Sequence, residues 1–243
     1  MDSSASALEK LKGCGSQGDF HGVIQLMQKH QDITDLQGRG CAALWKMIRP
    51  TRDTSYKNAN KENEIAIAEA GGIEVVLGAL KTHRQHPRVL AEALFAIFCL
   101  AVNADNKVKI AAAGGIESIL NAMKQHAQHE SVQENGCGAL RNLAFNADNQ
   151  VKIAAAGGIE SILNAMKQHA QHELVQQNGC GALLNLAVKN ADNQVKIAAA
   201  GGIADLINLA RKKHPRSANI MNHSKRLLEY IGAPLDTFSP AFF

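Results

Sequence analysis

No apolar run in this 243-residue sequence approaches the roughly 20 residues that a membrane-spanning helix needs. The first residues, MDSSASALEKLKG, lack the apolar core of a secretory signal, and the five cysteines include no CxxC pair. From these absences we expect a protein without a membrane span in an intracellular, reducing compartment. The cytoplasm is the favoured location, with the nucleus as the alternative.

Catalytic patterns are absent too. The sequence contains no nucleophile motif, no phosphate-binding loop and no dinucleotide-binding glycine pattern, so we expect no enzyme activity and no cofactor. Lys and Arg number 26 against 22 Asp and Glu, a formal net charge of +4, without the dense basic runs of nucleic-acid-binding proteins. Nucleic acid is therefore not favoured as a partner.

What the sequence does contain is an internal repeat with a period of 43 residues. Gly-Gly-Ile recurs at 71–73, 114–116, 157–159 and 201–203. Residues 103–145 and 146–188 are identical at 38 of 43 positions, which indicates duplication of one unit. A period of this length is typical of solenoids, in which helical units stack and bury a core between neighbours.

Each unit is predicted to form three helices, as the 146–189 unit illustrates. Asp148 and Asn149 are candidate caps of a short first helix, and Gly157 and Gly158 permit the sharp turn that ends it. A second helix follows with its apolar residues in one stripe, and a third helix supplies the remaining core. No strand-like alternation appears, so the predicted class is all-α.

Two matching segments carry a resemblance to a known family: Asn135-Gly-Cys-Gly-Ala-Leu-Arg-Asn-Leu-Ala144 and Asn178-Gly-Cys-Gly-Ala-Leu-Leu-Asn-Leu-Ala187. Both resemble the third-helix signature of the armadillo family, which includes importin-α and β-catenin. The resemblance covers about residues 6–232 and is clearest over 58–203. It implies a right-handed α-α superhelix of armadillo repeats, and a scaffold that holds a partner polypeptide in a concave groove formed by the third helices.

The repeat period divides the chain into five repeats and a tail. The expected boundaries are a divergent N-terminal capping repeat with a loop insertion at 6–57, armadillo repeats at 58–102, 103–145 and 146–189, a C-terminal capping repeat at 190–232, and an extended tail at 233–243. The insertion falls at 49–59. The last repeat carries a basic set that suits the polar outer face of a terminal repeat: Arg211, Lys212, Lys213, Arg216, Lys225 and Arg226.

In the armadillo family an asparagine on each third helix faces the groove, and the matching positions here are Asn142 and Asn185. A side-chain amide offers donors and an acceptor together, so it can bind the main chain of any extended ligand. The alternative role is a structural hydrogen bond inherited with the repeat.

Further residues are expected to line the groove or to anchor a partner: Trp45, Lys46, Arg49, Phe95, Phe98, Glu134, Arg141, Leu184 and Lys225. Large aromatic side chains are frequent interface anchors, although packing between repeats is the alternative for Trp45 and Phe98. The four basic residues of this set outnumber Glu134, so a protein or peptide ligand with acidic residues is favoured.

Two other functions remain as alternatives. Importin-α-like cargo receptors place tryptophan one turn before the groove asparagine, where this chain has Ala42, Phe95, Gly138, Gly181 and Lys225. That difference disfavours binding of nuclear localisation signals. The second alternative is a nucleic-acid or phosphoinositide binder that uses the basic segment 211–226.

The tail and the histidines give two further predictions. Three phenylalanines in the proline-interrupted segment 235–243 predict that it docks in the groove of its own chain or of a neighbour. Histidines recur as HxxH at 83/86, 126/129 and 169/172, a spacing that can present two metal ligands. Because the pairs lie at the junction of the second and third helices, we interpret them as a solvated junction and expect no metal.

Overall fold

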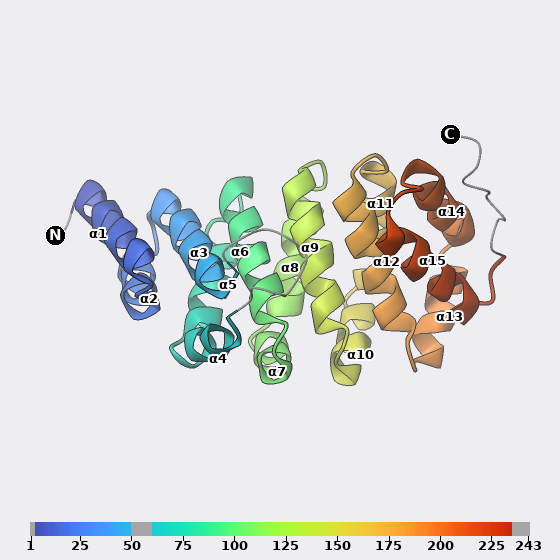
Figure 1. Ribbon diagram of the computed structural model, residues 1–243, viewed down its shortest axis with the longest axis horizontal. Coiled ribbons are helices and arrows are strands. Elements are labelled where there is room, and N and C mark those ends of the chain that lie inside the picture. Colours follow the sequence, from blue (N-terminus) through green and yellow to red (C-terminus); the bar gives the residue numbers. More distant parts are fainter. Residues whose placement is uncertain (1–2, 50–59, 235–243) are drawn as a thin grey trace. The chain divides into compact units, whose positions relative to one another are not determined.

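The computed structural model describes residues 3–49 and 60–234, and helices are the only regular secondary structure in that part of the chain (Figure 1). Residues 50–59 of the predicted insertion and residues 235–243 of the predicted tail lie outside the described residues. The chain folds as two units, residues 1–125 and 126–243, which are described separately. No helix of the described residues is long and apolar enough to cross a membrane.

The first unit contains α1 (Ser4–Gln17), α2 (Phe20–Lys29), α3 (Thr34–Ile48), α4 (Lys61–Glu69), α5 (Gly72–Thr82), α6 (Pro87–Leu100), α7 (Ala104–Ala112) and α8 (Gly115–Gln125). A short first helix, a second helix and a longer third helix follow one another, as α4, α5 and α6 show. The third helices α3 and α6 pack along each other, and α5 packs on α6. This is the order predicted from the repeat.

The second unit contains α9 (Glu130–Leu143), α10 (Ala147–Ala155), α11 (Gly158–Gln168), α12 (Glu173–Ala187), α13 (Ala191–Ala199), α14 (Ile203–Lys213) and α15 (Ala218–Tyr230). In this unit α12 packs against both α9 and α15, so the three third helices form one layer (Figure 1). The apolar stripe predicted on the second helix is buried: Ile159, Ile162, Leu163 and Met166.

The caps of the short first helices lie two residues earlier than the sequence predicted. Asn146 is extended, with φ −96° and ψ 130°, and its Oδ1 accepts a hydrogen bond from the Asn149 N–H at 3.0 Å. The expectation that Asp148 and Asn149 cap this helix is therefore wrong. Asn149 is already inside the helix, where it is buried and its Nδ2 donates to the Leu143 carbonyl oxygen at 3.3 Å.

The predicted glycine turn is confirmed in the same repeat. Gly157 has a φ of +80°, a left-handed conformation that side chains rarely adopt. Gly158 follows with no room for a side chain, because a Cβ there would lie 2.7 Å from the Ile153 carbonyl oxygen. The two glycines thus act differently. Gly157 allows the chain to turn, and Gly158 allows α11 to start in direct contact with the end of α10.

One member of the basic set in the last repeat does not lie on an outer face. Arg211 is 7% exposed, and its guanidinium lies close enough to the Cys180 thiol of α12 to act on its pKa. The other five residues of that set are exposed. The reason is the helical period: Arg211 follows the buried Ala210 and lies one turn after the buried Ile207, on the face of α14 that packs inward.

Candidate functional site

Side-chain amides join successive third helices in the second unit. Asn185 Nδ2 of α12 donates to the Arg141 carbonyl oxygen of α9 at 2.9 Å, and Asn178 Nδ2 donates to the Glu134 carbonyl oxygen at 3.2 Å. The two donors are seven residues apart, which places them on the same face of α12, two turns from each other. Asn185 therefore makes the structural hydrogen bond that was the alternative to ligand binding. Its Oδ1 and its second amide N–H can still bind a ligand. Its counterpart Asn142, expected at the groove surface, is only 7% exposed.

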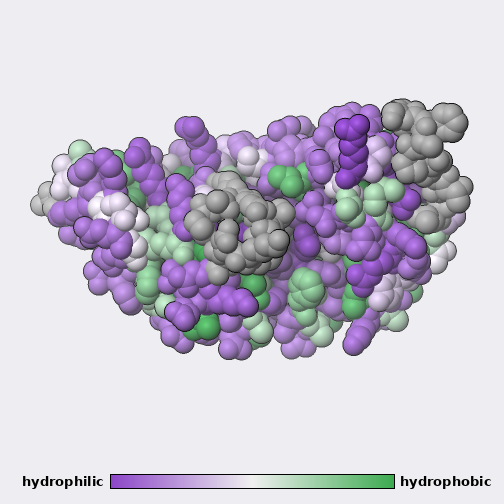
Figure 2. Space-filling view, viewed as in Figure 1, coloured by the Kyte–Doolittle hydropathy of each residue, from purple (hydrophilic) through white to green (hydrophobic). Residues whose placement is uncertain are grey.

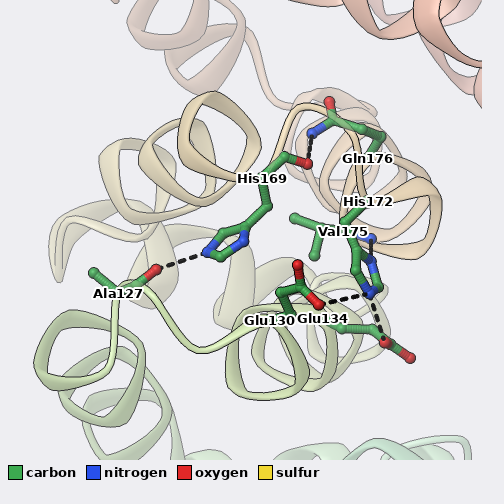
Figure 3. A network of polar contacts seen from close by, with 7 residues as sticks. All are labelled: Ala127, Glu130, Glu134, His169, His172, Val175 and Gln176. Carbon is green, nitrogen blue, oxygen red and sulfur yellow. Dashed lines mark hydrogen bonds and ion pairs between the residues drawn. The ribbon is translucent and has the colours of Figure 1, made fainter.

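The junction between second and third helices is solvated only in part. His86 is exposed and His172 is half-buried, whereas His83 and His169 are buried, contrary to the prediction for the histidine pairs. In two pairs the first histidine is buried and reaches the preceding repeat: His169 Nε2 bonds the Ala127 carbonyl oxygen at 2.7 Å (Figure 3). In the first unit His83 Nε2 bonds the Gln31 carbonyl oxygen at 2.8 Å in the same way. Each such histidine lies at the end of its second helix, where its ring can point toward the neighbouring loop.

A glutamine on the third helix completes this junction. Gln176 Nε2 donates to the carbonyl oxygens of Met166 at 2.8 Å and His169 at 3.0 Å, so it satisfies the C-terminal end of α11. Gln37 does the same for α2 in the first unit. Sequence analysis missed these glutamines, although Gln133 and Gln176 stand 43 residues apart, one period, and this recurrence could have identified the position.

The second histidine of the pair connects α12 to α9. His172 Nδ1 accepts a hydrogen bond from the Val175 N–H at 3.4 Å, and His172 Nε2 lies 3.9 Å from a carboxylate oxygen of Glu130 and of Glu134 (Figure 3). Because Nδ1 accepts, the neutral ring carries its proton on Nε2, facing the two carboxylates. A metal would need that nitrogen without its proton. Among the residues that the structure describes, no group of three or more His, Cys, Asp or Glu side chains is arranged to hold a metal ion.

In the first unit, the structure brings four predicted site residues together. The Trp45 ring meets Phe95 edge-on at 4.9 Å between centroids, and Phe95 and Phe98 lie 5.6 Å apart. The Arg49 guanidinium lies 5.4 Å from the Phe98 ring centroid, and all four side chains are buried. They were expected on an exposed groove face. They instead pack against one another between α3 and α6, which is the alternative that the sequence left open for Trp45 and Phe98. Lys46, next to Trp45 in the sequence, is exposed.

In the second unit, the remaining predicted residues are distributed over three helices. Arg141 of α9 is half-buried, and Lys225 of α15 is exposed. Leu184 of α12 is 2% exposed, so the expectation that it lines an open surface is wrong. An apolar side chain at this position is taken into the helix packing, whereas Arg141 at the same position of the preceding repeat is half-buried and its Nη1 donates to the Asn178 Oδ1 of α12 at 3.5 Å.

Comparison with known proteins decides the family. A family model described as the LRRK2 ARM repeat matches residues 16–155, more than half of the chain. The chain belongs to the armadillo-repeat family. A second family model, described as the C-terminal domain of protein zer-1 homolog-like proteins, matches residues 96–228 of these armadillo repeats. A search of curated proteins gave no match.

A solved structure has the same fold. It comes from work on a phosphorylation switch that controls the interaction between cadherin and β-catenin, and aligns with a TM-score of 0.70 at 17% sequence identity. The alignment covers 94% of this armadillo chain and 40% of the other chain, so this chain spans less than half the length of that protein. At this identity the likeness shows the fold alone, and it confirms the predicted all-α armadillo solenoid.

The two near-identical armadillo repeats differ mainly on one face of their third helices. Four of the five differences between 103–145 and 146–188 fall on or directly after the third helix: Ser131/Leu174, Glu134/Gln177, Arg141/Leu184 and Phe145/Val188. Steps of three, seven and four residues place these positions on a single helical face. Phe145, at the end of this row, is 67% exposed. The differences thus gather on this one face, whose members are half-buried or exposed in the first repeat, while Gln177 and Leu184 are buried in the second.

Proposed function

We propose that this armadillo chain is a protein-interaction scaffold that binds an extended or helical segment of a partner polypeptide along its third helices. The observation that carries this proposal is the divergence of the two duplicated repeats on one third-helix face. A purely structural duplicate has no reason to change at the exposed or half-buried members of this face, such as Phe145 and Arg141. A surface that contacts a ligand does have a reason, because successive repeats meet different residues of that ligand.

The chemistry of the third-helix surface suits a polar ligand. Asn185 can offer its Oδ1 and one N–H to a ligand main chain, since only one of its donors is used by Arg141. Arg141 and Lys225 provide positive charge, with Glu134 as the acidic member of the set. Figure 2 shows a face that is mostly hydrophilic, with apolar residues in small separate patches. We therefore propose a ligand with acidic residues, bound mainly through polar contacts and a few apolar anchors such as Phe145.

Two further parts of the proposal concern activity and location. We propose a non-enzymatic role, since the family fold is that of a scaffold and no catalytic motif stands in the sequence. We also propose an intracellular reducing location, the cytoplasm or the nucleus. The free thiols of Cys41, Cys99, Cys137 and Cys180 are buried in the described part of the chain, where they pack as small apolar groups.

Selection of peptides against the folded chain tests the proposal. Random peptides are displayed on phage, and the affinity of the selected peptides is measured by calorimetry for the unmodified chain and for the Asn142→Ala/Asn185→Ala double variant. Each lost ligand hydrogen bond is expected to cost about 0.5–1.5 kcal/mol of binding free energy. The control is Asn164→Ala, which removes an exposed amide from the second helix α11. Peptides that bind the double variant and the unmodified chain equally well would refute the third-helix site.

A further inference from the structure

Two hollows of the first unit lie between successive second helices and are lined by equivalent positions. The first hollow, about 200 Å³ in volume, lies between α2 and α5, and the second, about 520 Å³, lies between α5 and α8. Apart from Gln37 of α3, every residue that lines the first hollow has its equivalent in the second. The equivalent lies 53 residues further on for residues before the insertion and 43 residues further on for those after it. A difference between the two linings is therefore a difference in chemistry at the same place of the repeat.

The first hollow lacks the cations of the second. Lys81, Arg84 and Glu117 line the second hollow, so its carboxylate shares the space with two positive charges. The three equivalent positions of the first hollow carry two amides and a carboxylate: Gln28, Gln31 and Glu74. The first hollow therefore keeps the negative charge of the pattern and has lost its positive charges.

The glutamate alone does not distinguish the first hollow, because it recurs. It lies in the first turn of its second helix, where the helix dipole favours a negative charge. In the second unit the equivalent Glu160 also lies in a hollow with two cations, Lys167 and Lys196. The feature that sets the first hollow apart is the missing cation.

Within the first hollow, a neutral amide approaches the carboxylate. Gln28 Nε2 and Glu74 Oε2 each lie 3.8 Å from the place that a Cβ of Gly71 would take, and the next repeat has Lys81 at the position of Gln28. Glu74 makes no ion pair and no side-chain hydrogen bond within the described part of the chain. None of the Lys and Arg side chains of α2, α3, α4, α5 and α6 is among the described residues that line this hollow. The carboxylate is therefore open to a cation from outside the chain.

The first hollow is also more apolar than the second. Val75 and Gly78 of α5 stand where α8 has Ser118 and Asn121. Nothing lies within 4 Å of the place that a Cβ of Gly78 would take, so packing does not require a glycine there. A glycine inside a helix lowers the stability of that helix, and its effect here is to leave a gap beside Val75.

We propose that the first hollow binds a lysine or arginine side chain of a partner polypeptide. The cationic end of that side chain pairs with Glu74, which is exposed, and its aliphatic stem lies over Val75 and the gap at Gly78. The small volume of the hollow suits a single side chain. This site goes beyond the proposed function, because it lies between second helices and takes a basic rather than an acidic residue.

The second hollow is an internal control for this proposal. It has the same carboxylate at the same place, but Lys81 and Arg84 already supply positive charge and Asn121 fills the position of the gap. A basic ligand that recognises only negative charge meets Glu74 and Glu117 alike, whereas a ligand that needs the whole lining binds the first hollow.

The test is an NMR titration with hexalysine, which presents a lysine in every register, and with uncharged hexaglutamine as its control. Hexalysine is expected to shift the backbone amide signals of Gly78 and Ala79 more than those of the equivalent Asn121 and Ala122. Hexaglutamine is expected to shift neither pair. Equal shifts in the two hollows, or no shift at Gly78 and Ala79, would overturn the site. The proposed function would be unaffected, because its third-helix residues line neither hollow.

Two variants with the same change of charge locate the ion pair. Glu74→Gln is expected to weaken hexalysine binding about two- to fivefold, the range of an exposed ion pair. Glu117→Gln, in the second hollow, is expected to leave the affinity unchanged. Equal weakening by both variants would mean binding by overall charge and would refute the site, as would an unchanged affinity of Glu74→Gln.

A third variant tests the gap without changing the charge. Gly78→Asn installs the residue that the next repeat has at this position, Asn121, so the fold has a precedent for it. It is expected to weaken hexalysine binding without lowering the melting temperature, because asparagine is a better helix former than glycine. A Gly78→Asn variant that binds hexalysine as tightly as the unmodified chain would show that the gap does not hold the side chain.

Discussion

Asn185 of α12 donates its side-chain amide to the main-chain carbonyl oxygen of Arg141 in α9, across 2.9 Å. The residue that was expected to bind a ligand thus also holds two third helices together. Stability and binding are therefore linked at this position, and variants have to be measured for both properties.

Replacing Asn185 by alanine is expected to lower the free energy of unfolding by about 0.5–1.5 kcal/mol, because one hydrogen bond between repeats is lost. Urea denaturation followed by circular dichroism measures the change. The matched control Asn164→Ala, at an exposed position of α11, should stay within about 0.5 kcal/mol of the unmodified chain. A variant at Asn185 as stable as this control would show that the bond to Arg141 contributes nothing.

The position of the helix cap gives a second prediction. Asn146→Ala is expected to cost about 0.5–2 kcal/mol, because Oδ1 of Asn146 satisfies the Asn149 N–H at the start of α10. Asp148→Ala is expected to cost less than half as much, since Asp148 is exposed within the first turn and only interacts with the helix dipole. Thermal melting of both variants measures the difference, and the reverse order would restore the original prediction from the sequence.

Glu64 in α4 predicts a pH-dependent stability. Burial raises the pKa of this carboxyl, and the nearby Lys61, Lys107 and Arg49 reduce the shift only in part. A raised folded pKa means that the contribution to stability is fully present below the unfolded pKa and is lost as the pH rises through the folded pKa. Glu64→Gln, which keeps the shape without the charge, should therefore be more stable than the unmodified chain at neutral pH.

The same comparison at acid pH is the internal check. Below the unfolded pKa of a glutamate, about 4.3, the two proteins should be equally stable because Glu64 is protonated in both folded and unfolded states. The equivalent positions of later repeats, Gln150 and Gln194, already carry glutamine, which bonds carbonyl oxygens there. Glu62→Gln, exposed on the same helix, is the control. A stability difference that does not vary with pH would contradict the assignment.

Thiol chemistry gives a fourth prediction. Burial raises the pKa of Cys137 and of Cys180 to about 12, so neither forms a thiolate at mildly alkaline pH. Cys14 is half-exposed and should be the one thiol that iodoacetamide modifies in the folded chain. Mass spectrometry is expected to find one adduct before unfolding and five after it. Rapid labelling of Cys137 or Cys180 in the folded protein would show that the third helices separate readily.

The sequence by itself determined the repeat, the three helices of each unit and the glycine turn. These features depend on local conformation and on periodicity: Gly157 needs a positive φ, and the apolar stripe of α11 needs a partner, wherever the rest of the chain lies. The armadillo family followed from the third-helix segments alone, because duplication repeats the same local pattern at a fixed spacing.

Only the tertiary structure decided what the polar side chains do. Asn185, His169 and Gln176 all meet carbonyl oxygens of other helices or loops, and no spacing in the sequence indicates which carbonyl lies within reach. The same holds for the burial of Trp45 and Leu184, which depends on how a neighbouring helix packs. A side chain at a given helical position becomes surface or core according to what covers it, and the covering groups come from parts of the chain remote in sequence.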